Sequence, residues 1–140
     1  MTYRLCLFYG ILFLGGGLVI DFENKKYLKL KESPDYARKV EDLIVPGEEV
    51  LNGFQSMRDG IVFTTMRIIV VNVQGITGKK VDYTSLPYKR INAYSVETAG
   101  TFDLDAELDI FISGMGRMRF EFKGRNDIKE ISRYISQAIL

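Results

Sequence analysis

The feature that most constrains the fold is a series of short apolar runs between Glu49 and Phe122, separated by turn residues. These runs are rich in Val, Ile, Phe, Tyr and Thr, the residue types that favour strands, and their spacing is typical of an antiparallel meander. We expect strands near residues 49–56, 60–65, 67–73, 79–85, 90–98, 103–112 and 117–123.

A helix is predicted before the strands. Ser33, Pro34 and Asp35 combine a hydroxyl that can cap free amides, a proline at the first helical position and a carboxylate near the positive end of the helix dipole. Pro46-Gly47 is predicted to stop this helix. Its apolar face consists of Tyr36, Ala37, Val40, Leu43 and Ile44.

A second helix is predicted at the end of the chain, where Asn126 and Asp127 form a helix-start signal. About seven strands followed by one amphipathic helix favour a partly open barrel with the helix closing one end. The expected class is therefore mainly β with α (α+β), with residues 33–140 as one domain. The stripe of the closing helix consists of Ile128, Ile131, Ile135, Ala138 and Ile139.

Composition excludes several chemistries. The chain has 140 residues, no histidine and a single cysteine, which excludes histidine-dependent triads, zinc sites of the usual kind and an intramolecular disulfide. Nineteen Lys and Arg against eighteen Asp and Glu give a net charge of +1, which provides no general attraction to nucleic acid. We therefore expect a protein that is not an enzyme, binds no cofactor and is located in the cytoplasm.

The segment "GITGKKVDYTSLPYKRINAYSVETAGTFDLDAEL", preceded by "RDGIVFTTMRIIVV", resembles the bacterial pleckstrin homology (PH) domain family. The resemblance runs from about Glu48 to Leu140 and is specific over residues 58–108. It implies a PH-like barrel with an N-terminal helix and a C-terminal capping helix, and a tendency to form ring-like homo-oligomers. It implies no ligand.

Lipid binding does not follow from the resemblance. Eukaryotic PH domains that bind phosphoinositides carry basic residues in and beside the loop between their first two strands. Here that loop is "MRDG", with Arg58 as its single cation.

The first 32 residues fall outside the resemblance and form an N-terminal extension. Residues 5–20, "LCLFYGILFLGGGLVI", follow Arg4, carry no charge and precede a lysine-rich stretch. Sixteen residues are short for a membrane span, which needs about 20 apolar residues. Three readings stay open: a membrane signal that brings residues 5–20 into contact with a bilayer, a start codon assigned too far upstream, or a buried structural segment.

The stretch "GITGKK" at residues 75–80 has the composition of a phosphate-binding loop. A Walker loop, however, needs G-x-x-x-x-G-K-[ST] before a helix. Here the glycines are three residues apart, Lys80 occupies the hydroxyl position, and a strand-like run follows. The sequence predicts a strand reversal in which Gly75 and Gly78 supply positive φ angles.

A weak anion patch is the candidate binding site. It would bring together four cations if the fourth and fifth predicted strands pair across "SLPY". The alternative is that these cations are simply solvated residues at strand ends. The four residues are Lys79, Lys80, Lys89 and Arg90.

Carboxylates alternate along "DLDAELDI", and cations alternate along the next predicted strand. The apolar residues of both strands must face the core. This holds only if the numbers of residues that pair across the two strands sum to an even value, and that sum requires a loop of odd length around Gly114. One such register sets Asp109 beside Arg119 and Asp105 beside Lys123. We therefore interpret the acidic stripe as a solvated face rather than a metal or catalytic site; its carboxylates are Asp103, Asp105, Glu107 and Asp109.

The strand "RIIVVNV" is apolar on both faces, whereas a sheet with one wet side shows alternation. Either helices or another subunit must cover the second face. Phe111 also lies on the charged side of its strand. Ile68, Val70 and Phe111 are therefore candidate self-association residues.

Two functions are compatible with the sequence. The first is a non-enzymatic PH-like module that forms homo-oligomers and binds an unidentified protein partner. The alternative is a membrane-associated adaptor, tethered by the apolar N-terminal segment or weakly bound to anionic lipid through the Lys-rich stretch at 25–31.

Overall fold

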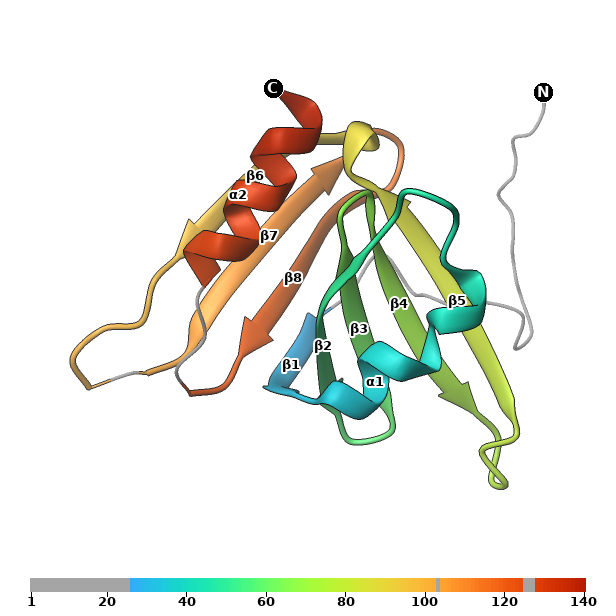
Figure 1. Cartoon of the computed structure of the whole chain (residues 1–140). Coiled ribbons are helices and arrows are strands. Elements are labelled where there is room, and N and C mark those ends of the chain that lie inside the picture. Colours follow the sequence, from blue (N-terminus) through green and yellow to red (C-terminus); the bar gives the residue numbers. More distant parts are fainter. Residues whose placement is uncertain (1–25, 103, 125–127) are drawn as a thin grey trace.

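The computed structural model describes residues 26–102, 104–124 and 128–140. The described residues form eight strands, two α-helices and two short 3₁₀ turns (Figure 1). In chain order these are β1 (Lys26–Glu32), α1 (Pro34–Lys39), η1 (Glu41–Leu43), β2 (Val50–Ser56), β3 (Asp59–Thr64), β4 (Arg67–Gln74), β5 (Lys80–Pro87), η2 (Tyr88–Arg90), β6 (Ile91–Glu97), β7 (Ala106–Ile112), β8 (Gly116–Phe122) and α2 (Ile128–Ile139).

The strands form one bent sheet in the order β5-β4-β3-β2-β1-β8-β7-β6. Its two halves, β2–β5 and β6–β8, stand at an angle to each other (Figure 1). Phe63 of β3 and Leu108 of β7 belong to the same buried cluster, so the main core lies between the halves. The expected mainly-β architecture is confirmed, with one strand more than the seven predicted.

Strand β1 joins the two halves of the sheet. It pairs antiparallel with β2 through Lys31 and Glu32, and parallel with β8 through residues that include Leu30. Leu30 is fully buried in the main core, and its carbonyl accepts a hydrogen bond from the Lys123 amide at 2.8 Å. The sheet therefore begins before residue 33, because the lysine-rich stretch assigned to the extension alternates apolar and charged residues as a strand does.

Helix α1 starts at the predicted proline but is the second element of the fold, after β1, rather than an N-terminal helix. The predicted hydroxyl cap is absent: Ser33 makes no side-chain cap hydrogen bond, and its Oγ donates to Gln55 instead, at 3.4 Å. The helix ends at Lys39 rather than near Pro46, and a 3₁₀ turn follows.

Helix α1 covers the outer face of the β2–β5 half. Tyr36 and Val40 pack against Val62, Ile69 and Val71 in a second buried cluster. Ile68 and Val70, on the other face of β4, belong to the main core and are fully buried. The strand is apolar on both faces because the chain itself covers both.

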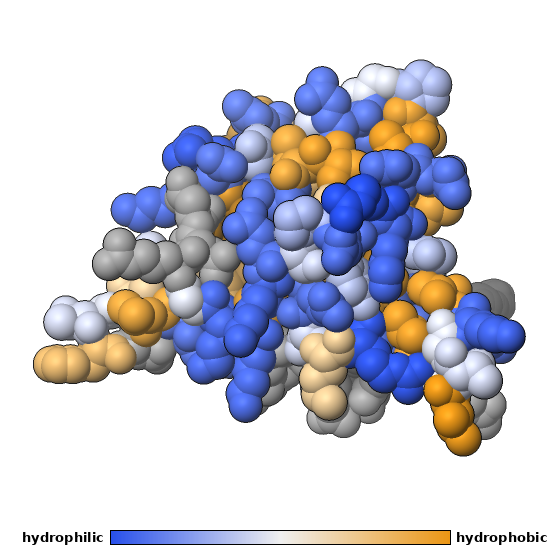
Figure 2. Space-filling view, turned by 60° about the horizontal axis from the view of Figure 1, so that its bottom comes forward, coloured by the Kyte–Doolittle hydropathy of each residue, from blue (hydrophilic) through white to orange (hydrophobic). Residues whose placement is uncertain are grey.

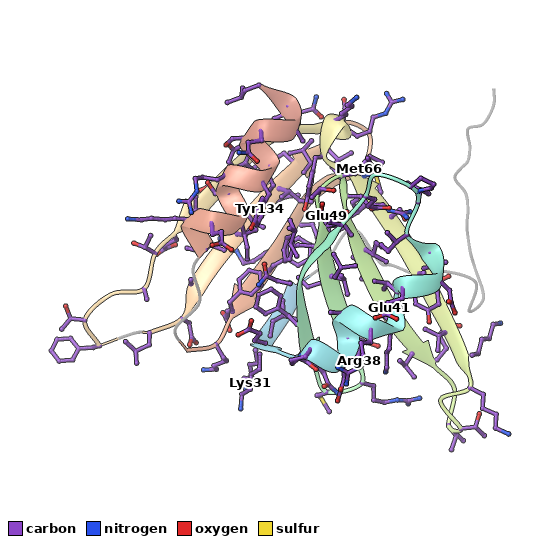
Figure 3. The ribbon with its side chains drawn as sticks, in the orientation of Figure 1. Lys31, Arg38, Glu41, Glu49, Met66 and Tyr134 are labelled. Carbon is purple, nitrogen blue, oxygen red and sulfur yellow. The ribbon has the colours of Figure 1, made fainter. Side chains whose placement is uncertain are left out.

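Helix α2 packs over the β6–β8 half (Figure 1). Ile128, Ile131 and Ile135 are buried in the main core, which confirms the predicted stripe. Tyr134 packs against the same core from the sheet-facing side of the helix (Figure 3). The predicted cap at residues 126–127 lies outside the described residues.

Candidate functional site

The four cations of the predicted anion patch lie at opposite ends of β5. Lys79 and Lys80 stand where β5 begins, whereas Lys89 and Arg90 belong to η2, which follows its end. The eight residues of β5 separate the two pairs by about 25 Å. The joint patch depended on pairing between residues 79–85 and 90–98, but β5 and β6 are the two end strands of the sheet.

Lys89 and Arg90 instead line a pocket beside η2, hereafter the η2 pocket. It has a volume of about 390 Å³ and lies between the end of β5, the start of β6 and the β7–β8 turn. The continuous segment that joins β5 to β6 thus meets the β7–β8 turn, which is distant from it in sequence. The remaining lining residues are Ser85, Leu86, Pro87, Asn92, Ile112, Ser113 and Met115.

Hydrogen bonds fix the polar wall of the η2 pocket. Asn92 Oδ1 accepts the Ser113 amide proton at 2.6 Å, which ties β6 to the β7–β8 turn. Ser85 Oγ accepts a hydrogen bond from Arg67 Nη1 at 2.9 Å. Leu86 and Ile112 supply apolar lining and are almost fully buried. The pocket therefore combines an ordered polar wall with an apolar floor.

Behind this wall lies a buried polar network around Glu48, whose side chain is completely buried. Arg67 donates to both carboxylate oxygens, from Nε at 2.9 Å and from Nη2 at 3.0 Å, and Thr64 Oγ1 donates at 2.6 Å. Burial acts to raise the pKa of Glu48, but the hydrogen bonds from Arg67 and Thr64 outweigh it, so the pKa lies below its usual value. The network anchors Arg67 and, through it, Ser85.

Tyr88, within η2, is also held in place. Its hydroxyl donates to the Thr64 carbonyl at 2.7 Å, and its ring is fully buried. Burial raises the pKa of this phenol well above its ordinary value, so the hydroxyl stays protonated as a donor. The backbone that carries Lys89 and Arg90 is therefore fixed at its first residue.

The acidic stripe on β7 is neutralised by β8 in the predicted register. Asp109 pairs with Arg119 across the strands, and Arg119 also forms an ion pair with Glu107 at 2.9 Å. Lys123 Nζ lies 2.9 Å from Asp105. Hydrogen bonds from Arg119 and Lys123 hold the pKa values of Asp109 and Asp105 below their usual range. Asp103 lies outside the described residues.

The two glycines of "GITGKK" adopt the predicted positive φ angles, +75° at Gly75 and +68° at Gly78. The loop reverses the chain between β4 and β5, and the Arg58 guanidinium donates a hydrogen bond to the Gly75 carbonyl. The loop is therefore a turn, and the cation beside it, Arg58, is hydrogen-bonded to the backbone of the loop.

Of the three candidate self-association residues, Phe111 alone is on the surface. It is 38% exposed on the outer face of β7, whereas Ile68 and Val70 are fully buried inside the chain. Phe111 pairs with Ala93 on β6 and Arg117 on β8, so its ring has a very small neighbour on one side.

Two further exposed apolar residues stand at hairpin tips. Met57, 92% exposed with φ +52°, lies in the β2–β3 turn, and Ile76 is fully exposed in the β4–β5 turn. Both turns lie at the lower end of the molecule in Figure 1. Figure 2 brings that end forward and shows hydrophobic side chains as small separate areas among hydrophilic ones.

A second, more open concavity lies beside the β2–β3 turn. Its volume is about 810 Å³, and it is lined by Lys29, Lys31, Glu32, Ser33, Gln55, Ser56 and Met57. Lys31 extends from the end of β1 at the lower edge of the molecule (Figure 3). The sequence did not indicate that these residues lie together: Ser33 was predicted to cap a helix, and Lys29 and Lys31 were placed in the extension outside the domain.

The described residues offer neither a metal-binding cluster nor a membrane-spanning helix. No group of three or more His, Cys, Asp or Glu side chains in these residues is arranged to hold a metal ion. In the same part of the chain, no helix is both long and apolar enough to cross a membrane.

Comparison with known proteins identifies relatives over most of the chain. An uncharacterised protein of Bacillus subtilis, YjqA, is 47% identical over 96 residues, which cover 67% of this chain and 77% of YjqA. Among solved structures, a DUF1696 family protein with a pleckstrin homology domain from Shewanella loihica is 38% identical with a TM-score of 0.66. The match covers 81% of this chain and 99% of that one.

A pleckstrin homology domain from Shewanella amazonensis is 41% identical with a TM-score of 0.55, over 76% of this chain and 87% of that one. The profile of the family described as "Bacterial PH domain" matches residues 21–139, which include β1. The chain therefore belongs to the bacterial PH domain family.

Proposed function

We propose that the protein is a non-enzymatic interaction module that associates with copies of itself, in a ring-like homo-oligomer, and presents its strand faces and loops to a protein partner. The observation that carries the proposal is the exposure of Phe111 on the outer face of β7. Aromatic residues are enriched at protein interfaces, and this ring lies between Ala93 and Arg117 of the neighbouring strands.

The two ends of the sheet supply a second line of support. In the described sheet, β5 and β6 each pair on one side only. An end strand offers free backbone donors and acceptors to another chain. Because the two ends are different strands, contact between β5 of one copy and β6 of the next is heterologous and closes into a ring if the rotation permits. Phe111 lies one strand inside the β6 end.

The state of the carboxylates supports a non-catalytic role. General acid chemistry needs a carboxyl group with a raised pKa. Here Asp105 and Asp109 have lowered pKa values and are ion-paired with cations of the neighbouring strand. The relative YjqA is itself uncharacterised, so it indicates no activity for this chain. We expect the module to be cytoplasmic, because its single cysteine allows no intramolecular disulfide.

Co-purification of two differently tagged copies tests the proposal. Both copies are expressed together, and the first tag is used to capture the second. We expect capture of wild-type copies and at least tenfold less capture when both carry Phe111→Glu, because a buried unpaired carboxylate opposes association. Ile76→Glu is the matched control, since it places the same charge on a fully exposed apolar site away from β7. Absence of capture between wild-type copies would contradict the proposal.

The second candidate function is weak contact with anionic lipid. The exposed side chains of Met57 and Ile76 at the hairpin tips favour it, and Lys79 and Lys80 follow Ile76 where β5 begins. Apolar side chains beside cations are suited to a bilayer surface. Vesicle co-sedimentation distinguishes the two functions: Ile76→Glu should reduce lipid binding and leave self-association intact, whereas Phe111→Glu should do the reverse.

A further inference from the structure

We propose that the η2 pocket binds a small phosphorylated molecule, with the phosphate held by Lys89 and Arg90 and the uncharged part on the apolar floor. This site is separate from the self-association surface around Phe111 and from the hairpin tips. It also differs from the patch that the sequence suggested, since Lys79 and Lys80 are at the other end of β5.

The lining of the pocket is rich in hydrogen-bond donors and contains no acid. Besides the two cations, Ser85, Asn92 and Ser113 carry hydroxyl or amide groups. A phosphate dianion accepts several hydrogen bonds at once, and guanidinium and ammonium groups are its usual partners in proteins. Two positive charges and no negative one give the pocket a local charge of +2 in a chain whose net charge is only +1.

Lys89 and Arg90 are also free to take a ligand. Within residues 26–102, 104–124 and 128–140, neither side chain forms an ion pair. The fold does pair cations where carboxylates are near, as Arg67 and Arg119 demonstrate. What distinguishes Lys89 and Arg90 is their place: they are adjacent cations that line a concave site whose lining contains no carboxylate.

The size and floor of the pocket limit what the phosphate can be attached to. A volume of about 390 Å³ lies at the small end of the range for small-molecule sites, roughly 300–1,000 Å³. Leu86 and Ile112 form an almost fully buried apolar floor, and Met115 lines the pocket from the β7–β8 turn. A compact phosphomonoester fits this combination, with its carbon skeleton on the floor and its phosphate at the rim.

The pocket is preorganised by hydrogen bonds within its wall and behind it. Tyr88 is anchored to Thr64, Ser85 is held by Arg67, and the Asn92 side chain accepts the Ser113 amide proton. The segment from β5 to β6 and the β7–β8 turn are therefore fixed before any ligand arrives, which lowers the entropic cost of binding. If Lys89 and Arg90 were only solvated residues at a strand end, these hydrogen bonds would not be needed to hold their backbone in place.

Phosphorus NMR of the ligand tests the proposal on the full chain. Glycerol 3-phosphate and inorganic phosphate are the soluble probes, at pH 7.5 and about 150 mM salt, where screening weakens contacts between exposed charges. We expect saturable broadening of the phosphate resonance with wild-type protein. Lys89→Ala/Arg90→Ala should weaken binding at least about tenfold, because it removes two charge-assisted hydrogen-bonding groups.

Lys79→Ala/Lys80→Ala is the matched control, because it removes the same charge at the opposite end of β5. It should leave the affinity for the soluble probes within about twofold of wild type. Ser113→Glu, a substitution at an exposed turn residue, places a carboxylate in the pocket and should abolish binding without affecting the fold. Equal losses in the two double variants would overturn the proposal, since they would indicate a general charge effect.

A second experiment, with lipid vesicles, determines whether the bound phosphate belongs to a lipid or to a soluble molecule. Vesicles of phosphatidylcholine with and without phosphatidic acid present the same phosphomonoester on a lipid. Sedimentation that requires phosphatidic acid, Lys89 and Arg90 would assign the site to a lipid headgroup, and binding of soluble probes alone would assign it to a metabolite. Either result supports the proposal. Failure of the soluble probes and of the phosphatidic acid vesicles to bind through Lys89 and Arg90 would overturn it.

Discussion

Asp109 and Arg119 face each other across β7 and β8 and form two hydrogen bonds, from Nε to Oδ1 and from Nη2 to Oδ2, each 2.9 Å long. The Asp109 side chain is only 12% exposed, so water screens this pair less than a typical surface pair. The pair thus links β7 to β8 on the outer face of the β6–β8 half.

Asp109→Asn should lower the free energy of unfolding by about 1 kcal/mol at pH 7, because one charge-assisted pair is lost. Arg119 lowers the pKa of Asp109 in the folded state. The pair therefore contributes its full stabilisation above the pKa of about 4 that Asp109 has in the unfolded chain, and it loses this stabilisation as the pH falls through the lower pKa of the folded state. Urea unfolding at pH 7, 5 and 3 should therefore show a difference that shrinks at pH 3.

Asp35→Asn is the control for that series. Asp35 pairs with Arg38, but its side chain is 75% exposed, so the change should stay within about 0.5 kcal/mol at every pH. A pH-independent effect of Asp109→Asn would contradict the role assigned to its ionised form.

Glu48→Gln should cost about 3 kcal/mol, because it leaves the Arg67 guanidinium without its charged partner in a buried network. Glu49→Gln is the matched control: Glu49 is exposed and lies beside Met66 at the surface (Figure 3). Urea unfolding of the two variants at pH 7 measures the difference, and equal midpoints would show that the network is not needed for stability.

A chain that begins at residue 33 should lose cooperative thermal unfolding, whereas a chain that begins at residue 21 should keep it. The shorter chain lacks Leu30, which is fully buried in the main core, and leaves β2 and β8 without the strand between them. Circular dichroism melting curves compare the two. The same midpoint in both chains would mean that β1 contributes nothing to the fold.

Gly53→Ala should detach α1 from the sheet. A Cβ atom at this position would lie 2.6 Å from the Ala37 amide nitrogen and 2.8 Å from the Ser33 carbonyl oxygen, and backbone cannot give way as a side chain can. We expect a loss of about 2–3 kcal/mol and faster amide hydrogen exchange throughout α1. Gly47→Ala, which meets no atom within 4 Å, should be strained by its positive φ but leave exchange in α1 unchanged.

The sequence was sufficient where a local rule decides the structure. Seven strands lie within a few residues of their predicted bounds, and the Asp109–Arg119 pairing is one of the registers that the parity of inward-facing residues allows. The stripe on α2 followed from helical spacing. The periodicity of apolar residues specifies the strands and this stripe, and it limits the register, without knowledge of distant contacts.

Features that depend on distant contacts were not predictable in the same way. Lysines concealed the alternation of Leu28 and Leu30, so β1 was assigned to the extension. Ile68 and Val70 were candidate contact residues because a strand that is apolar on both faces looks the same whether its own helix or a partner covers it. Asn92 and Ser113 come together through the pairing of β6 with β7, and no sequence motif indicates that the Asn92 side chain accepts the Ser113 amide proton.

Light scattering coupled to size-exclusion chromatography tests self-association most directly. At tens of micromolar, the wild-type protein should elute with a mass that is a multiple of 16.0 kDa. Phe111→Glu should shift the mass toward the monomer, and Ile76→Glu should leave it unchanged. A clean wild-type monomer at these concentrations would contradict the proposed assembly.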